Sequence, residues 1–118
     1  MQAKILVVDD EPLARRNISI FLRENGYQTV EARDGKEALA VLQNEKVDLV
    51  ITDIRMPQLN GLLLRDIIAS TRPGTPTLLV TAYYGDLVKA RLDPDAFVLK
   101  PIVLEELLER TQKLLARA

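Results

Sequence analysis

The sequence predicts an α/β fold in which helices cover both faces of a doubly wound, five-stranded parallel sheet. Short apolar runs rich in Val, Ile and Leu alternate five times with segments of helical periodicity, and no long linker interrupts them. The runs are mostly continuous rather than alternating, as in strands that are buried on both faces. The chain has 118 residues, which is room for one core, so we expect a single domain over residues 1–118.

Each predicted element has its own local signal. Pro12 suits the first turn of the first helix, and Asn25-Gly26 suits its end. Asp34 can cap the second helix, and residues 72–76 break the third. The strands are expected at residues 4–8, 27–32, 48–52, 77–81 and 96–99. The helices, the last of which starts near Val103, are expected to bury Ala14, Ile18, Phe21 and Leu22; Ala38, Leu39 and Leu42; Leu64, Ile67 and Ile68; and Leu104, Leu107, Leu108 and Leu115.

The composition excludes several classes of function. Lys and Arg number 16 against 17 Asp and Glu, which is not the basic excess of a nucleic-acid-binding protein. Cysteine and histidine are absent, so disulfides, Cys/His zinc sites and thiol or imidazole catalysis are excluded. The apolar runs are too short for a membrane span or a signal peptide. We therefore expect a cytoplasmic protein whose chemistry uses carboxylates, lysine, hydroxyls and the backbone.

Polar residues follow the strands at the edge where the carboxyl ends of parallel strands meet, which is where open α/β sheets bind ligands. Asp9 and Asp10 follow the first strand, Asp53 the third, Thr81 the fourth and Lys100 the fifth. Three converging carboxylates repel one another and favour a hard divalent cation such as Mg²⁺, with Mn²⁺ and Ca²⁺ as alternatives. Lys100, the Thr81 hydroxyl and loop amides can then bind a phosphoryl group. Asp53 is best placed to accept that group as an aspartyl phosphate.

Four blocks of the sequence resemble the response-regulator receiver domains of two-component signalling. The blocks are Val7-Val8-Asp9-Asp10-Glu11-Pro12, Asp53-Ile54-Arg55-Met56-Pro57 with Gly61, Thr81-Ala82, and Lys100-Pro101. They stand in the order and spacing of that family and cover nearly the whole chain. The resemblance implies one flavodoxin-like receiver domain with the strand order 2-1-3-4-5. It also implies a switch that catalyses only its own phosphorylation and dephosphorylation, and not an enzyme with a separate substrate.

The resemblance also implies a role for each residue that binds metal or phosphate. Asp53 is implied as the phosphoacceptor, which takes its phosphoryl group from a kinase phosphohistidine. Asp53, Asp10 and the backbone carbonyl of Arg55 are implied as direct Mg²⁺ ligands, with Asp9 acting through water. The backbone amides of Arg55 and Ala82 are expected to bind phosphate oxygens.

The remaining implied roles concern the switch and its partners. Lys100 is implied as the phosphate partner, in a cis peptide bond to Pro101. Thr81 is implied as the switch hydroxyl and Phe97 as the switch aromatic. The implied partners are a sensor histidine kinase or phosphotransfer protein, and an output partner or attached output domain. We expect no direct binding of nucleic acid or membrane by this domain.

The segment between the fourth and fifth strands departs from the family pattern. Lys100 follows Thr81 by 19 positions, a few fewer than usual, so the helix near residues 86–92 is expected to be short. In many relatives the face that contains this helix carries dimerisation or partner binding. A phosphorylation-dependent dimer of the ordinary form is therefore in doubt.

Other interpretations compete with the phosphoacceptor. A phosphatase on a similar sheet would need a second acid two residues after the nucleophile, where this chain has Arg55. A flavin or nucleotide carrier would need a Gly-rich or Ser/Thr-rich loop after a strand. A receiver-like interaction module that works without phosphorylation is the main alternative. Each site residue also has a structural interpretation: Asp10 as a helix N-cap, Asp53 as an acceptor of backbone amides, Thr81 and Phe97 as packing residues, and Lys100 as a solvated lysine.

Arg55 and Tyr83 stand at the two variable positions that flank the site in the family and influence the attack of water on the phosphoryl group. Two bulky side chains there crowd the in-line path of the water, so we expect slow self-dephosphorylation. The measurement is the lifetime of the phosphate in the wild type and in the Arg55→Ala/Tyr83→Ala variant. A shorter lifetime in the wild type would contradict this expectation.

Overall fold

The fold was analysed in a computed structural model, which describes residues 2–117. Five parallel strands form one sheet in the order β2-β1-β3-β4-β5, as predicted. The strands are β1 (Lys4–Val8), β2 (Gln28–Ala32), β3 (Leu49–Asp53), β4 (Thr77–Thr81) and β5 (Phe97–Leu99). Their bounds differ from the predicted ones by no more than one residue at either end. The order places β1 beside β3 at the centre, so the residues that follow these two strands are neighbours.

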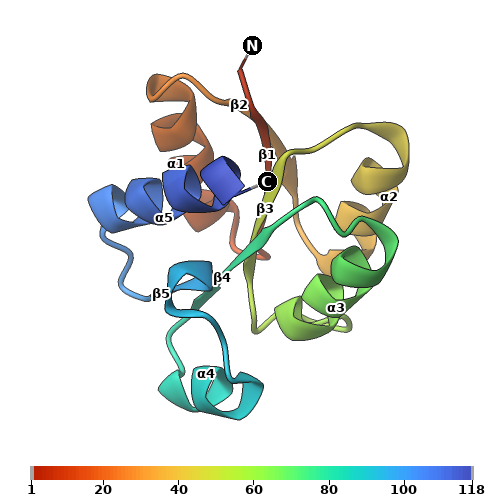
Figure 1. The fold of residues 1–118 in the computed structure, drawn as a ribbon, viewed down its shortest axis with the longest axis vertical. Helices are drawn as coiled ribbons and strands as arrows, with labels where there is room; N and C mark the ends of the chain where they lie inside the picture. The colour runs from red at the N-terminus through yellow and green to blue at the C-terminus, as the bar shows by residue number, and fades with distance from the viewer. Residues whose placement is uncertain (1, 118) are drawn as a thin grey trace.

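Helices cover both faces of the sheet, which confirms the doubly wound arrangement (Figure 1). In Figure 1, α1 and α5 lie on one side of the strands and α2 and α3 on the other, while α4 lies apart at the lower end. The helices are α1 (Pro12–Glu24), α2 (Gly35–Asn44), α3 (Gly61–Thr71), α4 (Tyr84–Ala90) and α5 (Leu104–Arg117), and a 3₁₀ turn, η1 (Pro94–Ala96), precedes β5. The fourth helix is short, as expected, with seven residues, although it begins two residues earlier than predicted.

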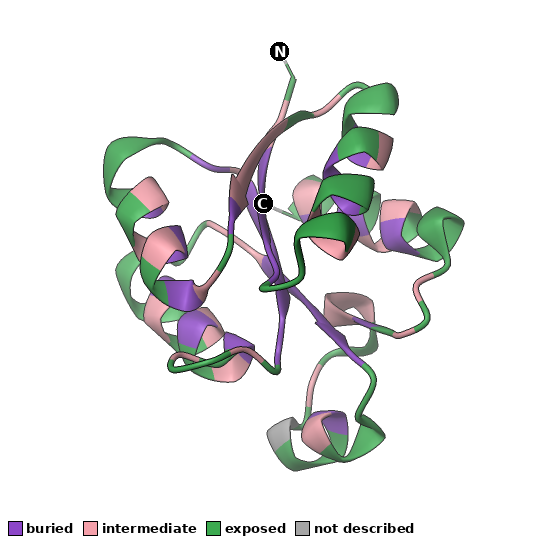
Figure 2. Cartoon of the chain, turned by 180° about the vertical axis from the view of Figure 1, so that it is seen from behind, coloured by how far each residue is buried: buried purple, intermediate pink, exposed green. Residues whose placement is uncertain are grey.

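Two hydrophobic clusters hold the helices to the sheet. Side chains that alternate along β1 separate them: Ile5 and Val7 pack toward α1 and α5, whereas Leu6 and Val8 pack toward α2 and α3. Every residue of β3 and β4 is buried, and the burial colours of Figure 2 show these strands at the centre of the molecule. The central strands therefore form a firm base for the loops at their carboxyl ends.

The prediction of the buried face of α5 was wrong at Leu104, which is 36% exposed. The helix buries Leu107, Thr111 and Leu114 instead, at positions i, i+4 and i+7 of one helical face. Leu104 is the first residue of α5 and lines a surface hollow next to Lys100, beside the loop after β5. Leu108 and Leu115 are only half-buried, because they flank this face.

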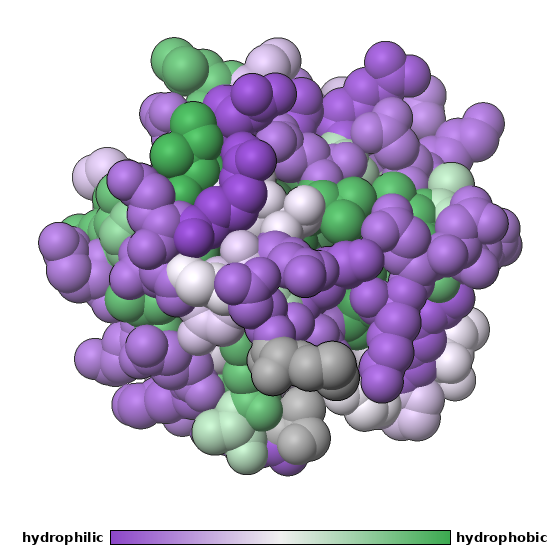
Figure 3. Space-filling model, turned by 90° about the horizontal axis from the view of Figure 1, so that it is seen from above, coloured by the Kyte–Doolittle hydropathy of each residue, from purple (hydrophilic) through white to green (hydrophobic). Residues whose placement is uncertain are grey.

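The surface at the end of the sheet opposite the carboxyl ends of the strands is mainly hydrophilic, and its hydrophobic side chains form small separate groups (Figure 3). This end carries the amino ends of the strands, and the sequence predicts no site there. Within residues 2–117, none of the helices combines the length and the hydrophobicity that crossing a membrane requires.

The second sequence block needs a residue without a side chain at Gly61, because the backbone at the end of β3 and the start of α3 meet there. A Cβ atom at Gly61 would lie 2.2 Å from the carbonyl oxygen of Asp53 and 2.9 Å from the Cα atom of Ile54. The Gly61 amide also donates a 2.8 Å hydrogen bond to the Ile54 carbonyl. A side chain at this position would therefore displace the end of the strand that carries Asp53.

We expect Gly61→Ala to lower the free energy of unfolding by about 2–3 kcal/mol, because a backbone clash cannot be relieved by a side-chain movement. The matched control is Gly74→Ala, where a Cβ atom meets nothing within 4 Å. This control should change stability by less than about 1 kcal/mol. Urea unfolding of both variants measures the difference, and equal stabilities would contradict the packing argument.

Candidate functional site

Three acidic residues converge at the carboxyl edge, as the sequence predicts. Asp53 is the last residue of β3, and Asp9 follows β1, whose Val8 pairs with Thr52. One carboxylate oxygen from each of Asp9, Asp10 and Asp53 lies within 4.8 Å of the other two. Asp9 and Asp53 are buried and Asp10 is exposed, so the cluster opens to solvent on one side.

Asp9 is the acid that organises the start of α1. Its Oδ1 atom accepts a 2.9 Å hydrogen bond from the backbone amide of Glu11. Burial raises the pKa of the Asp9 carboxyl, and the charges of Asp53 and Asp10 raise it further. The hydrogen bond from the Glu11 amide and the positive charge of Lys100 lower it, but by less, so the pKa is raised overall. The N-cap interpretation of Asp10 is wrong, because Glu11 is the N-cap of this helix, and the Glu11 side chain makes no capping hydrogen bond. The exposed carboxylate of Asp10 is therefore left free of a capping role.

Lys100 forms the ion pair of the site. Its Nζ atom lies 2.8 Å from Oδ2 of Asp53, whose side chain is only 8% exposed. Partial burial lowers the pKa of Lys100, but the hydrogen bond and the charge of Asp53 outweigh it and the pKa is raised. The lysine thus stays protonated and keeps its positive charge at the acid cluster. The Lys100–Pro101 peptide bond is cis, as predicted.

Backbone groups of two loops complete this edge. The Arg55 amide donates a 3.3 Å hydrogen bond to Oδ1 of Asp53. Asp53 therefore accepts a hydrogen bond from a backbone amide, as expected if its role is structural. Ala82 follows Thr81 directly and is exposed, in the loop after β4. The Lys100 amide donates to the Thr81 carbonyl at 2.9 Å, which ties the end of β5 to the end of β4.

The contacts of Thr81, the last residue of β4, and of Phe97, the first residue of β5, face α4. The Thr81 side chain is fully buried, and its hydroxyl lies 3.3 Å from Oδ2 of Asp86. The hydroxyl oxygen also accepts a 3.1 Å hydrogen bond from the Tyr83 amide. Phe97 is half-buried against a small cluster that includes Leu87 of α4. Thr81 thus links the end of β4 to the short helix through a polar contact, and Phe97 links β5 to it through apolar packing.

Asp86 is a site residue that the sequence analysis did not find. Its carboxylate accepts hydrogen bonds from Nε and Nη2 of Arg55, at 3.1 and 3.2 Å. The Arg55 guanidinium also lies 4.0 Å above the ring of Tyr83. Because Arg55 precedes Asp86 by 31 positions, no local pattern in the sequence indicates this contact.

Comparison with known proteins decides the family. The sequence model of the family described as the response regulator receiver domain matches residues 5–112, which include every residue of the site described above. The chain belongs to this family. It is therefore a receiver domain of the kind found in the response regulators of two-component signalling.

Curated relatives and solved structures agree with this membership. The chain is 38% identical to the response regulator MprA of Mycolicibacterium vanbaalenii over 122 residues, which cover 99% of this chain and 52% of that protein. It is 36% identical over 118 residues to the probable transcriptional regulatory protein TcrX of Mycobacterium tuberculosis, covering 96% of this chain and 50% of TcrX. The chain thus spans about half the length of these curated relatives.

Among solved structures, the chemotaxis response regulator CheY4 of Vibrio cholerae superposes with a TM-score of 0.86 at 30% identity, covering 97% of this chain and 99% of CheY4. A CheY-like receiver domain from Methanospirillum hungatei superposes with a TM-score of 0.88 at 29% identity, covering 99% and 96%. The receiver domain therefore matches both structures over nearly their full length.

The donor set of the acid cluster fits the Mg²⁺ that receiver domains typically bind. Asp9, Asp10 and Asp53 offer carboxylate oxygens and neither nitrogen nor sulfur, which suits a hard cation. Their mutual repulsion is a second reason, because a divalent cation would relieve it.

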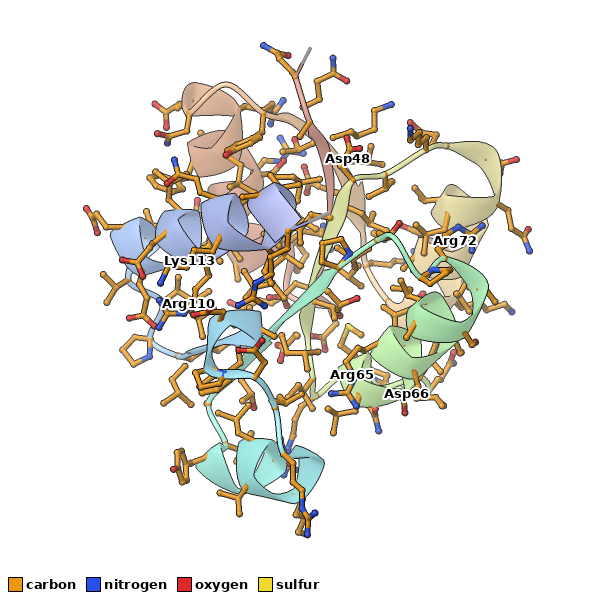
Figure 4. All side chains as sticks on the ribbon, viewed as in Figure 1. Asp48, Arg65, Asp66, Arg72, Arg110 and Lys113 are labelled. Carbon is orange, nitrogen blue, oxygen red and sulfur yellow. The ribbon has the colours of Figure 1, made fainter. Side chains whose placement is uncertain are left out.

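We expect Asp10→Asn to stabilise the metal-free domain by about 0.5–1 kcal/mol, because it removes one member of a repelling cluster at an exposed position. The same change should reduce the stabilisation that millimolar Mg²⁺ gives to the wild type. Thermal unfolding in EDTA and in MgCl₂ measures both effects. The control is Asp66→Asn on α3 (Figure 4), where the carboxylate pairs with Arg65. An Asp10→Asn domain that is less stable in EDTA, or equally stabilised by Mg²⁺, would contradict the cluster argument.

Proposed function

We propose that this receiver domain is a phosphorylation-controlled switch in which Asp53 accepts a phosphoryl group from the phosphohistidine of a sensor kinase or phosphotransfer protein. One observation carries the proposal: the buried carboxylate of Asp53 contacts Lys100 at 2.8 Å within a cluster of three acids. A carboxylate held beside a cation, and next to a set of oxygen donors that suits Mg²⁺, is arranged to receive an anionic group.

The chemistry of the transfer follows from these groups. An oxygen of the ionised Asp53 carboxylate attacks phosphorus, and a new O–P bond forms as the P–N bond to the donor imidazole breaks. The electron pair of that bond stays on the imidazole nitrogen, which binds a proton from solvent. Lys100, which neutralises Asp53 beforehand, is within reach to neutralise the transferred oxygens afterwards.

The proposed metal site supplies the remaining positive charge. Asp10, Asp53 and the Arg55 carbonyl, with Asp9 acting through water, would hold Mg²⁺, which would neutralise the negative charge of the entering phosphoryl oxygens. The amides of Arg55 and Ala82 are proposed to donate to the same oxygens. The Arg55 amide already points at the Asp53 carboxylate, which supports this assignment.

The output of the switch follows from what the new charge changes. We propose that Thr81 moves toward the phosphoryl group and that Phe97 turns inward in response, which re-packs the surface around α4. An attached output domain is the proposed receiver of this change. Two facts support it: the chain spans about half the length of its curated relatives, and one of them is named a probable transcriptional regulatory protein.

Intact-mass spectrometry after incubation with acetyl phosphate or phosphoramidate tests the proposal. We expect one added phosphoryl group in the presence of Mg²⁺, and none in EDTA, because both charge neutralisation and the nucleophile are required. Asp53→Asn keeps the shape of the side chain and should abolish the addition, whereas Asp66→Asn should leave it unchanged. No addition to the wild type would favour the alternative, a receiver-like interaction module that works without phosphorylation.

A further inference from the structure

The Thr81 hydroxyl already has a partner in the unphosphorylated domain, and that partner is not the phosphorylation site. We propose that Asp86 is a positioning residue that holds Thr81 away from Asp53 and must release it before the switch can turn. This inference rests on the proposed function of Asp53 and adds to it a control on how readily the site is occupied.

The single proton of the Thr81 hydroxyl is already used in a hydrogen bond. Oγ1 of Thr81 lies 3.3 Å from Oδ2 of Asp86, and it accepts the Tyr83 amide at 3.1 Å. A hydroxyl has one proton, and the carboxylate of Asp86 can only accept, so the proton of Thr81 points to Asp86. The same proton cannot also be donated to a phosphoryl oxygen on Asp53. The two acceptors therefore compete for one donor.

Arg55 holds the Asp86 carboxylate in place for this contact. Its guanidinium donates to both oxygens of Asp86 and stacks over the Tyr83 ring 4.0 Å away. The Asp86 side chain is 17% exposed, so its bond to Thr81 is shielded from water, whereas Arg55 is 58% exposed. The loop after β3 is thereby joined to α4 and to the end of β4 through one carboxylate. Thr81 and the surface around α4 are the parts that the proposed switch must move.

Release of this contact has a direct chemical consequence. A Thr81 side chain that is free of Asp86 can turn its hydroxyl toward Asp53, where it would stabilise the phosphoryl group. Loss of one hydrogen bond that favours the unphosphorylated form corresponds to a change of about fivefold in an equilibrium or rate. Asp86 thus makes phosphorylation slower than the acid cluster alone would allow.

Two measurements on the same variants test the inference. The first is the χ1 rotamer of Thr81 in the unphosphorylated domain, obtained from three-bond NMR couplings. We expect one rotamer in the wild type, averaged rotamers in Asp86→Ala, and an intermediate result in Asp86→Asn, whose amide oxygen still accepts a hydrogen bond. The second is the rate of phosphorylation by acetyl phosphate with Mg²⁺, which should rise about fivefold in Asp86→Ala.

The control is Asp66→Ala, which removes an exposed, ion-paired aspartate from α3 and should leave both measurements unchanged. A single Thr81 rotamer in Asp86→Ala, or averaged rotamers with no faster labelling, would overturn the inference while the wild type is still phosphorylated. An absence of labelling in the wild type and in all variants would instead overturn the proposed function, and the inference with it.

Discussion

Repulsion among three carboxylates at the end of a buried sheet is the constraint on which the rest of this structure depends. Asp9, Asp10 and Asp53 lie within 4.8 Å of one another because β1 and β3 are neighbours in the sheet. Lys100 directly follows β5, which β4 separates from β3 in the sheet. Its ammonium group reaches Asp53 and offsets part of the negative charge. The hydrophobic clusters on both faces hold the strands in register, and so they hold like charges together that would separate in a less rigid protein.

The sheet is a rigid base, whereas α4 is attached to it by few contacts. β3 and β4 are buried throughout, whereas α4 packs through a small cluster around Leu87 and lies apart from the other helices (Figures 1 and 2). Few apolar contacts mean a low cost of local movement. Polar contacts through Asp86 and Thr81 therefore have a large share in placing this segment. That division suits the proposed switch, in which charge gained at the strand ends would move a helix without disturbing the core.

Much of the fold and site could be predicted because each depends on short-range patterns. The apolar runs located the strands to within one residue, and Asp34 caps α2 as expected, with a 2.8 Å bond from the Glu37 amide. The strand order came from family resemblance, since periodicity does not encode which strands pair. Leu104 was misassigned because helical spacing does not say where the sheet beneath a helix ends. Asp86 was missed because its partners come from distant parts of the chain and meet only through tertiary folding.

A crystal structure of the domain with Mg²⁺ and beryllofluoride, a non-covalent mimic of a phosphoryl group on a carboxylate, tests the central claim most directly. We expect the metal at the cluster of Asp9, Asp10 and Asp53 and the mimic on Asp53. We also expect Lys100 and Thr81 to contact the fluorines, with the hydrogen bond between Thr81 and Asp86 broken. A metal or mimic bound elsewhere, or Lys100 still paired with a bare Asp53, would contradict the claim.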